Sequence, residues 1–285
     1  MNSCNKPDAV PENPMWDTRF KSYAFADGLA EELCAIFRDA EGLLLQSRVV
    51  KNSRSTTAGI FTVNGVDYFV KRSNVNSFFE RVKRIGRQPR SMRNLQVTNK
   101  LEQLGIAVPQ IFMTLSTAPG LLPGASYLIT ECFPEPMTAA NNLTALLESA
   151  GSERNLASKI AQMACKLHDN GVEHGDFKLN NILNICCPDG SYKLGLFDFD
   201  GSVLYAGSCP DNVRIKELAR IASSYFMRCC DLELAAAGDF TRMIRLWAEV
   251  YAQCGAKDFS ENSKYLRRCR KFLPRKLRDQ VDLYA

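Results

Sequence analysis

The chain has 285 residues, of which 46% are hydrophobic and 24% are charged; this size and balance fit one folded unit of two lobes. It contains no run of about 18 apolar residues, so we expect no membrane-spanning helix. The eleven cysteines and two histidines include no Cys-x-x-Cys pair, which argues against a zinc module and favours reduced thiols. With a net charge of only +5, we expect no nucleic-acid partner.

The N-terminal residues 1–14 are polar, contain three prolines and lack an apolar signal core. We therefore expect residues 1–20 to form a mobile lead-in, and we expect the protein to stay in the cytoplasm. An N-terminal lobe should begin at residue 21.

Three short apolar stretches, 49–51, 59–63 and 66–71, predict antiparallel strands. Asn64 and Gly65 lie between the second and third stretches. An Asn-Gly pair is a strong hairpin signal, because both residues tolerate the positive φ angles of a type I′ turn. We expect these strands to form one small sheet.

A hydroxyl-rich loop, 52–58, separates the first two stretches, and Lys71 ends the third. A lysine at the end of an apolar strand can blunt a sheet edge or pair with nucleotide phosphates, and motifs further along the chain favour the phosphate role. The loop has no Gly-x-Gly-x-x-Gly pattern. Its backbone and hydroxyl donors, chiefly Ser55 and Thr56 together with Arg54, could still hold phosphate.

Apolar residues at helical spacing predict a helix from about Ser91 to Gly105. In a nucleotide site Lys71 would need an acidic partner, and this helix offers only Glu102, close to its C-terminal end. Glu80 is the other candidate, so the partner of Lys71 stays open at this point.

A strand is expected to start after 105–110, and 126–131 forms a further β stretch that the sequence Cys-Phe-Pro interrupts. In a two-lobed nucleotide-binding protein such a break is the hinge, whose backbone hydrogen-bonds adenine. We therefore expect the lobe boundary near 131–138, with Glu131 and Phe133 as candidate nucleotide contacts.

Apolar residues from Leu156 to Leu167 recur at helical spacing, and Gly171 is a natural stop for the helix that they predict. This helix delivers the chain into the sequence His-Gly-Asp-Phe-Lys-Leu-Asn-Asn at 174–181. We interpret His174 as a structural residue that packs and hydrogen-bonds, with proton transfer as the weaker alternative.

The same stretch, together with Leu-Phe-Asp-Phe-Asp at 196–200, indicates phosphoryl transfer. Asp176 would accept the proton of the acceptor hydroxyl, and Asn181 and Asp198 would offer hard oxygen ligands to magnesium on the nucleotide phosphates. The five-residue step from Asp176 to Asn181 matches the spacing of the kinase catalytic loop. Lys178 could reach the γ-phosphate and offset its charge.

Two β-rich stretches, 181–185 and 192–196, flank the turn sequence at 188–191 and predict a hairpin. Because a hairpin returns the chain to its starting point, Asn181 and Asp198 can converge. The alternative is a Gly-Asp turn and an unrelated acidic turn in another α/β protein. The order of the motifs and the hairpin between them favour the kinase interpretation.

On these motifs the chain resembles the bacterial lipopolysaccharide core kinases, a heptose-kinase-like family related to protein kinases. The resemblance implies an α+β, two-lobed protein-kinase-like fold with a small antiparallel-sheet N-lobe carrying one helix (21–134) and a mainly helical C-lobe (135–285). It also implies ATP and Mg²⁺ as cofactors and a sugar hydroxyl of the lipid-linked core oligosaccharide, heptose in the first place, as acceptor. The resemblance rests on 68–71, 104–109, 127–131, 174–178 with Asn181, and 197–200.

An amphipathic helix is predicted over 213–221. Relatives often carry an acid where Glu217 stands, which implies that Glu217 braces the catalytic loop. A solvated glutamate on a charged helix face is the alternative.

Positive charge is concentrated in 71–93 and in 264–278, and the second segment contains no acidic residue. Because apolar residues are interleaved with its cations, the second segment could lie on the anionic inner face of the cytoplasmic membrane of a Gram-negative bacterium. Each basic residue would then contribute about 1 kcal/mol. A solvated basic helix is the alternative.

Two further functions stay open. A small-molecule or atypical protein kinase would share the His-Gly-Asp and Asn pattern, and only the acceptor pocket would differ. A nucleotide-binding pseudokinase would explain the missing glycine-rich loop, but such proteins usually lose a residue equivalent to Asp176, Asn181 or Asp198, and all three are present.

Overall fold

We describe the fold from a computed structural model of the chain, and the residues described are 15–17, 21–75, 77–86, 88–118, 122–133, 138–187 and 191–281. The chain forms two compact units. Unit 1 comprises residues 1–98 and 109–133, and unit 2 comprises residues 99–108 and 134–285.

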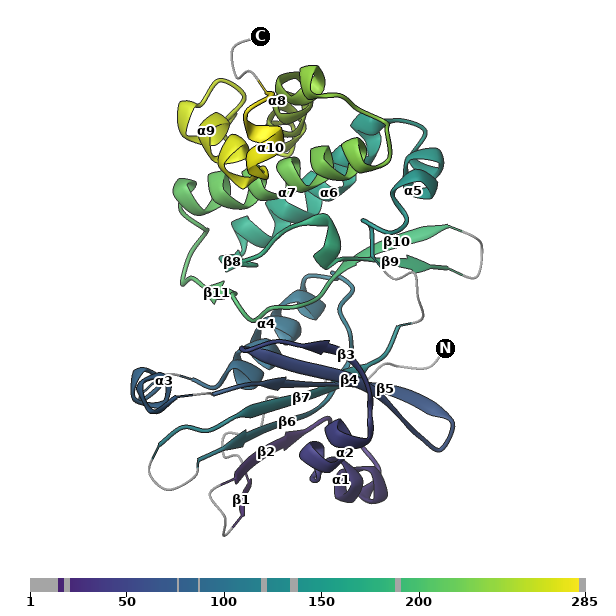
Figure 1. Ribbon diagram of the computed structural model, residues 1–285, viewed down its shortest axis with the longest axis vertical. Coiled ribbons are helices and arrows are strands. Elements are labelled where there is room, and N and C mark those ends of the chain that lie inside the picture. Colours follow the sequence, from purple (N-terminus) through teal and green to yellow (C-terminus); the bar gives the residue numbers. More distant parts are fainter. Residues whose placement is uncertain are drawn as a thin grey trace. The chain divides into compact units, whose positions relative to one another are not determined.

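Within its described residues, unit 1 is built on an antiparallel sheet of seven strands in the order β1-β2-β6-β7-β5-β4-β3 (Figure 1). Strand β5 has β7 on one side and β4 on the other, which places Lys71 inside the sheet and away from its edges. The strands are β1 (Met15–Asp17), β2 (Lys21–Phe25), β3 (Arg48–Asn52), β4 (Thr56–Val63), β5 (Val66–Ser73), β6 (Ile111–Thr117) and β7 (Ser126–Glu131).

The hairpin between β4 and β5 turns at Asn64 and Gly65, whose φ angles are +52° and +77°. Two positive φ angles are what a type I′ turn requires, so the predicted turn is confirmed. Along β5 successive side chains alternate between the two faces of the sheet. Tyr68 and Val70 belong to a buried apolar cluster on one face, and Lys71 lies on the opposite face.

The apolar face of the sheet is covered by α1 (Glu31–Phe37) and α2 (Ala40–Gln46), which Figure 1 shows on one side of the strands. Phe37 is fully buried, and its ring packs edge-on against Tyr68 at 5.1 Å and Phe61 at 6.0 Å between ring centroids. Aromatic pairs in this geometry contribute about 0.5–1.5 kcal/mol beyond the area that they bury. This cluster fixes the strands that carry the candidate nucleotide-binding residues.

The one helix predicted for this lobe is confirmed as α4 (Arg90–Gln103). The expectation of a single helix is wrong, because α1, α2 and α3 (Phe78–Lys83) also form. Each of these three has six or seven residues, which is too short for a helical period to show in the sequence. Strand β1 falls within 1–20, where a mobile lead-in is expected; residues 1–14 and 18–20 lie outside the described residues.

Unit 2 consists mainly of helices (Figure 1). Its core includes Trp247 and Tyr225, which are buried with ring centroids 5.4 Å apart. The helices are α5 (Leu143–Ala150), α6 (Glu153–Asp169), α7 (Asp211–Asp231), α8 (Phe240–Ala252), α9 (Ser263–Phe272) and α10 (Arg275–Arg278).

Four short strands lie between α6 and α7 in the described part of the chain. The predicted hairpin is confirmed as β9 (Ile182–Cys186) and β10 (Tyr192–Leu196), which pair antiparallel. The turn residues 188–190 lie outside the described residues. A second antiparallel pair joins β8 (Val172–Glu173) and β11 (Val203–Leu204).

Among the described residues, no helix combines the length and the apolar character that crossing a bilayer requires. The described cysteines are all free thiols, and they range from buried Cys165 to exposed Cys186.

Candidate active site

The predicted catalytic loop follows β8 and ends in a 3-10 helix, η1 (Leu179–Asn181). Asn181 Nδ2 donates to the main-chain oxygen of Asp176 at 2.9 Å and to its Oδ2 at 3.2 Å. The N–H of Phe197 donates to the main-chain oxygen of Asn181 at 3.2 Å. The hairpin therefore brings Asp176, Asn181 and the residue before Asp198 together, as the sequence predicts.

Asp198 has a φ angle of +65°. Such a conformation in a residue other than glycine costs about 1–3 kcal/mol and is concentrated at functional sites. The next residue, Phe199, is buried, and its ring centroid lies 5.2 Å from that of His174. Ser202 Oγ donates to the main-chain oxygen of His174 at 2.8 Å. The loop that carries Asp198 is thus fastened to the catalytic loop.

Two glycines let these loops touch through their backbones. Gly175 has a φ angle of +86°, and a Cβ atom at this position would lie 2.8 Å from the Cα of Gly201 and closer still to its carbonyl group. A residue with a side chain would meet both a strained backbone and a steric overlap. Glycine at 175 is therefore a requirement of the loop contact.

The carboxylate of Asp176 is held on both oxygens. Lys178 Nζ lies 2.7 Å from Oδ2, and Arg220 Nη1 donates to Oδ1. Partial burial disfavours the charged form, but the hydrogen bond and charge of Lys178, then the charge of Arg220 and the hydrogen bond of Asn181, outweigh it. They hold the pKa of Asp176 below its usual range, so this carboxylate is ionised at neutral pH.

Arg220 is a site residue that the sequence analysis does not identify. It lies on α7, and its guanidinium carbon is 4.6 Å from the ring centroid of Phe272 on α9. The signal that could have found it is its spacing. Because Arg220 follows Glu217 by three residues on one helix, a loop-bracing glutamate would place this arginine on the same helix face.

His174 is fully buried and packs against the rings of Phe177 and Phe199, with centroid distances of 5.8 Å and 5.2 Å. Its Nδ1 accepts the N–H of Asp176 at 3.4 Å, and its Nε2 has no hydrogen-bond partner among the described residues. Burial lowers the pKa of His174 despite the nearby carboxylates. A neutral, packed histidine agrees with the structural interpretation.

Glu217 is a buried carboxylate that braces the catalytic loop. Its oxygens accept the backbone N–H groups of His174 at 3.0 Å and Gly175 at 2.6 Å, and Oε2 lies 3.1 Å from His168 Nε2. Burial opposes ionisation, but the hydrogen bond from His168 and the contacts with His174 hold the pKa of Glu217 below its usual range. The bracing interpretation is confirmed, and the solvated alternative is wrong.

In unit 1, Lys71 is only 9% exposed and pairs in register with Ala58 of β4 and Leu128 of β7. The edge-strand alternative is wrong, because β5 has a strand on each side. The phosphate role of Lys71 stays a prediction, as does its acidic partner. Glu80 lies on α3 in the same unit, whereas Glu102 belongs to unit 2.

The loop predicted at 52–58 is shorter in the structure. Strand β4 already begins at Thr56, so only 53–55 lie between β3 and β4. Thr56 is 4% exposed, and its N–H donates to Ser53 Oγ at 3.2 Å. The hydroxyl-rich run extends the strand because Thr is β-branched and packs well in a sheet. The loop boundary is thereby corrected, and Ser55 is the loop member of the predicted pair of phosphate donors.

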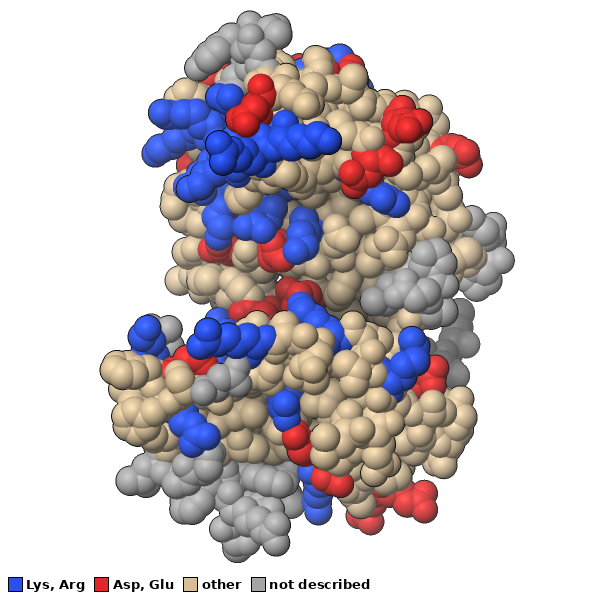
Figure 2. Space-filling view, viewed as in Figure 1, with Lys and Arg blue, Asp and Glu red and all other residues tan. Residues whose placement is uncertain are grey.

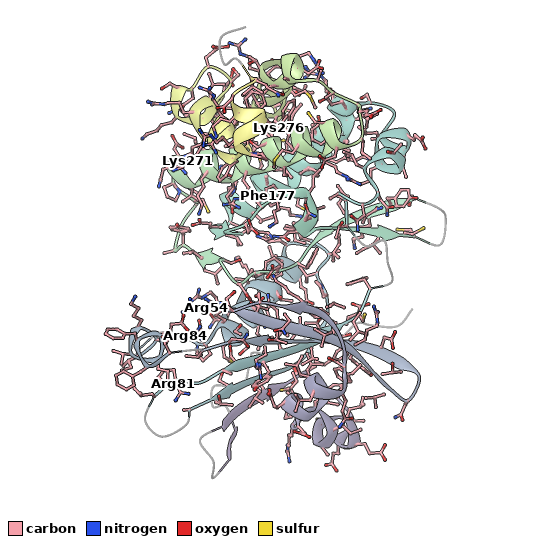
Figure 3. The ribbon with its side chains drawn as sticks, in the orientation of Figure 1. Arg54, Arg81, Arg84, Phe177, Lys271 and Lys276 are labelled. Atoms are coloured by element: carbon pink, nitrogen blue, oxygen red, sulfur yellow. The ribbon has the colours of Figure 1, made fainter. Side chains whose placement is uncertain are left out.

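Asn74 fixes this turn. Its N–H donates to the oxygen of Ser55 at 2.9 Å, and its own oxygen accepts Arg84 Nη2 at 3.1 Å. Figure 3 shows Arg54, Arg81 and Arg84 on the same side of unit 1. These cations give the turn the sign of charge that phosphate requires.

Strand β7 ends at Glu131, where the sequence predicts a break, and the hinge role of the following residues stays a prediction. The N–H of Glu131 donates to the oxygen of Gln110 at 2.9 Å, and Phe133 is half-buried. The adenine contacts of Glu131 and Phe133 stay predictions, and residues 134–137 lie outside the described residues.

The donor chemistry near Asp176 fits magnesium bound together with phosphate. Within the described ranges, no group of three or more His, Cys, Asp or Glu side chains is placed to hold a metal ion by itself. Magnesium at nucleotide sites needs only one or two protein carboxylates, because phosphate and water complete its shell. The amide nitrogen of Asn181 points to Asp176, which leaves its amide oxygen as a hard donor; the carboxylate of Asp198 is the second candidate donor.

The fold is similar to that of a solved structure titled WaaP in complex with acyl carrier protein. The match has a TM-score of 0.61 and covers 91% of this chain and 99% of that chain, with 16% sequence identity. The chain therefore has a protein-kinase-like fold, as predicted.

Residues 42–245 match the model of the lipopolysaccharide kinase (Kdo/WaaP) family, and the chain belongs to this family. A 3-deoxy-D-manno-octulosonic acid kinase of Vibrio cholerae serotype O1 is 29% identical over 131 residues, 46% of this chain and 52% of that protein. The protein of the same name from Vibrio parahaemolyticus is 29% identical over 113 residues, 40% of this chain and 44% of that protein. The chain thus spans about half the length of the curated relatives that it matches.

Proposed function

We propose that the protein is an ATP-dependent kinase that phosphorylates a sugar hydroxyl of the lipopolysaccharide inner core. The observation that carries the proposal is the hydrogen-bonded grouping of Asp176 and Asn181 with the chain segment that enters Asp198. This grouping offers a base and hard oxygen donors in the order that phosphoryl transfer requires. Membership of the lipopolysaccharide kinase family supports it.

In the proposed reaction the acceptor oxygen forms a bond to the γ-phosphorus while the bond from that phosphorus to the bridging oxygen of ADP breaks. Asp176 takes up the proton of the acceptor hydroxyl. Lys178 offsets charge on the transferring group, and Lys71 pairs with the nucleotide phosphates. Asn181 and Asp198 would hold magnesium, which would supply positive charge to the phosphate oxygens.

The acceptor sugar has two candidates. The sequence resemblance favours heptose, whereas the names of the Vibrio relatives favour 3-deoxy-D-manno-octulosonic acid. Both sugars carry secondary hydroxyl groups from which Asp176 could take a proton, so the proposed catalytic residues could act on either sugar. We therefore propose an inner-core sugar as acceptor and leave the choice between the two to the assay.

The experiment compares transfer of radiolabelled phosphate from ATP to core glycolipid that ends in each sugar, with choline, an aminoglycoside and a generic protein as further acceptors. We expect label in one glycolipid, no label with Asp176→Asn, and a phosphate-sized mass increase in the core oligosaccharide. Transfer only to a small molecule or protein would favour the alternative kinases. Nucleotide binding without any transfer would favour a pseudokinase.

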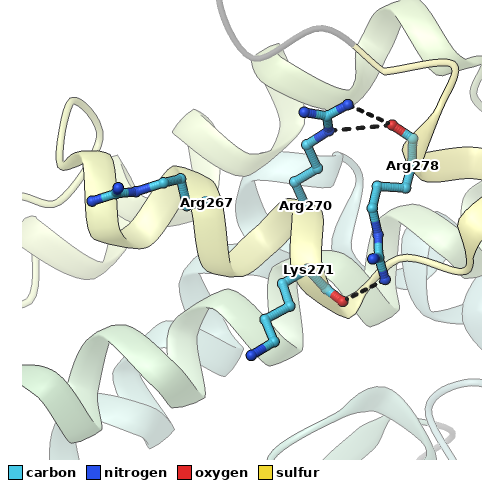
Figure 4. Close-up of a pocket in the computed structure, with 4 residues that line it drawn as sticks. All are labelled: Arg267, Arg270, Lys271 and Arg278. Carbon is cyan, nitrogen blue, oxygen red and sulfur yellow. Dashed lines mark hydrogen bonds between the residues drawn. The ribbon is translucent and has the colours of Figure 1, made fainter.

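We also propose that α9 and α10 face an anionic membrane surface, which would bring the enzyme to a lipid-linked acceptor. Figure 2 shows Lys and Arg side chains gathered over these helices, and Figure 3 places Lys271 and Lys276 there. An open pocket of about 230 Å³ lies among them (Figure 4). Its lining residues are Arg267, Arg270, Lys271 and Arg278.

The pocket cations are held by backbone groups. Arg270 donates from Nε and Nη2 to the oxygen of Arg278, both at 3.2 Å, and Arg278 Nη2 donates to the oxygen of Lys271 at 3.0 Å. No acidic side chain among the described residues pairs with these cations. They keep their charge for an external anion, and a lipid phosphate has the matching chemistry.

Co-sedimentation with vesicles tests the membrane proposal. We expect the full chain to bind vesicles rich in anionic lipid, to leave neutral vesicles in solution, and to release at high salt. Arg267→Glu with Lys271→Glu should abolish binding, whereas the exposed pair Lys159→Glu with Lys193→Glu should retain it. Equal loss in both double variants would contradict the proposal. Acyl carrier protein, the partner in the WaaP structure, is added in a separate arm to test whether it competes with vesicles for this surface.

A further inference from the structure

We propose that Arg220 binds an anionic group of the acceptor, a carboxylate or a phosphate close to the hydroxyl that is phosphorylated. The inference rests on the proposed function and names the acceptor chemistry that the site selects. It assigns a binding role to a residue on α7 that no sequence motif marks.

The first observation is that two cations pair with Asp176. Lys178 occupies Oδ2 and Arg220 occupies Oδ1, while Asn181 also donates to Oδ2. When Asp176 takes up the proton of the acceptor in the proposed reaction, its negative charge is lost, and both cations lose their counter-ion.

The two cations differ in the anion that could replace Asp176 as their partner. Lys178 has an anion in the proposed reaction, the γ-phosphate of the nucleotide, to which it can turn when nucleotide binds. The proposed reaction assigns Arg220 no nucleotide phosphate. Its release from Oδ1 would leave a partly buried guanidinium without a counter-ion, which is costly unless another anion replaces Asp176. An anionic group of the acceptor would supply that replacement as it arrives.

The second observation is the way Arg220 is mounted. Its guanidinium lies over the ring of Phe272 with 4.6 Å from carbon to centroid, and its Nε is buried without a hydrogen-bond partner among the described residues. The side chain is 30% exposed, so part of it remains open to solvent. Stacking on an aromatic ring fixes the guanidinium plane while it leaves the donor edge available.

The third observation concerns what else faces this guanidinium. Phe272 belongs to α9, the helix whose Lys271, Arg267 and Arg270 line the cationic pocket. The cations of α9 and Arg220 are therefore joined through one helix. A planar fork of N–H donors matches carboxylate and phosphate oxygens in a bidentate manner, whereas a neutral hydroxyl uses only one donor. The geometry thus selects an anionic acceptor over a neutral one.

The test measures kcat and KM with matched acceptors. The glycolipid that the wild-type enzyme uses is compared with two derivatives, one with its carboxylate reduced to an alcohol and one with its existing phosphates removed. We expect wild-type KM to rise about ten- to a hundredfold for the derivative that lacks the group bound by Arg220. Whichever derivative shows the rise identifies that group as carboxylate or phosphate.

Arg220→Met should raise KM for the intact acceptor to the level of that derivative and should no longer distinguish the two. Arg220→Lys should restore part of the preference, and Phe272→Leu should weaken it without removing it. Arg245→Met on α8, whose ion pair with Glu261 lies at the surface, is the matched control and should behave as wild type. Thermal unfolding and nucleotide affinity, measured on each variant, confirm that the fold and the donor site are intact.

Two results overturn the proposal separately from the proposed function. If wild type transfers phosphate equally well to all the acceptors, or if Arg220→Met lowers kcat by one factor for all of them, Arg220 only positions Asp176. If the wild-type enzyme transfers phosphate to none of the glycolipids, the proposed function fails first. Binding of the free anionic sugar, followed by calorimetry with wild type and with Arg220→Met, gives a readout independent of turnover.

Discussion

At the scale of single residues, the site is dominated by two carboxylates in opposite surroundings. Asp176 is partly exposed and accepts from charged side chains, whereas Glu217 is buried and accepts mainly from backbone N–H groups. The first arrangement keeps a base available beside solvent, and the second keeps a loop rigid. Each can be tested by a substitution that preserves its shape.

Asp176→Asn should spare nucleotide binding and remove turnover. The amide keeps the size of the side chain but cannot accept the proton of the acceptor, and loss of a general base costs about a hundred- to ten-thousandfold in rate. Nucleotide affinity by calorimetry and phosphate transfer by the glycolipid assay separate the two effects. Turnover at the wild-type rate would contradict the role assigned to Asp176.

Glu217→Gln should destabilise the fold by about 2–3 kcal/mol, because the new amide presents N–H groups to backbone N–H groups that need an acceptor. Denaturant unfolding at neutral pH measures this loss. Catalytic activity should fall with it, since His174 and Gly175 lose the partner that holds their loop. The size-matched control is Glu249→Gln, whose ion pair with Arg154 is exposed.

Wild type and Glu217→Gln should also differ in how their free energy of unfolding depends on pH. The folded pKa of Glu217 lies below the ordinary value of 4.5, so its stabilisation is complete above pH 4.5 and is lost as the pH falls through the folded pKa. The stability difference between wild type and Glu217→Gln should therefore be largest at neutral pH and should shrink in acid. Thermal melts across this range measure it, and a constant difference would mean that charge is not involved.

Residue-level prediction from the sequence succeeds where spacing is local. Asp176 and Asn181 are five residues apart, and a loop motif can place them without knowledge of the fold. Arg220 lies beyond a hairpin and a helix start, and its contact with Asp176 depends on how α7 packs against the loop. That packing is decided by buried side chains along the whole helix, which no short motif describes.

At the scale of elements, turns with strong local chemistry were predictable and short helices were not. Asn64 and Gly65 determine the β4–β5 turn by their tolerance of positive φ, so the hairpin follows from two residues. In contrast, α1 and α2 have seven residues each and depend on the sheet that they cover. The predicted start of β4 is wrong because the hydroxyl of Thr56 is typical of a loop, whereas its β-branched side chain packs in the strand.

Gly175→Ala tests the contact between the catalytic loop and the loop that carries Asp198. The positive φ at 175 and the overlap with Gly201 should cost at least about 2 kcal/mol and should displace the base. Gly207→Ala is the matched control, since a Cβ atom there meets nothing within 4 Å. Thermal unfolding and transfer activity should both fall in the first variant and stay unchanged in the second.

At the scale of the whole molecule, the folded helical unit extends beyond the residues that match the family model. The match ends at residue 245, but α9 packs against α7 and buries Tyr265 and Cys269 completely. Tyr265 OH donates to the oxygen of Ile244 at 2.7 Å, and Ser223 Oγ donates to that of Cys269 at 2.9 Å. The C-terminal helices are therefore part of the core of unit 2.

Removal of residues 263–285 should consequently yield an unstable or aggregated protein, because apolar surface of α7 and α8 becomes exposed. Tyr265→Phe, which removes a single buried hydrogen bond, should cost only about 1 kcal/mol. Expression in soluble form and thermal unfolding distinguish these outcomes. A stable, cooperative fold in the truncated chain would contradict the assignment of α9 to the core.

The stacking of Arg220 on Phe272 joins a helix inside the family match to one outside it. Selection for a charged acceptor would then constrain both positions together. In family members that use an uncharged acceptor, both positions would be free to change. Inherited pairs of arginine and aromatic at these two places, or their joint disappearance, would record changes of acceptor during the history of the family.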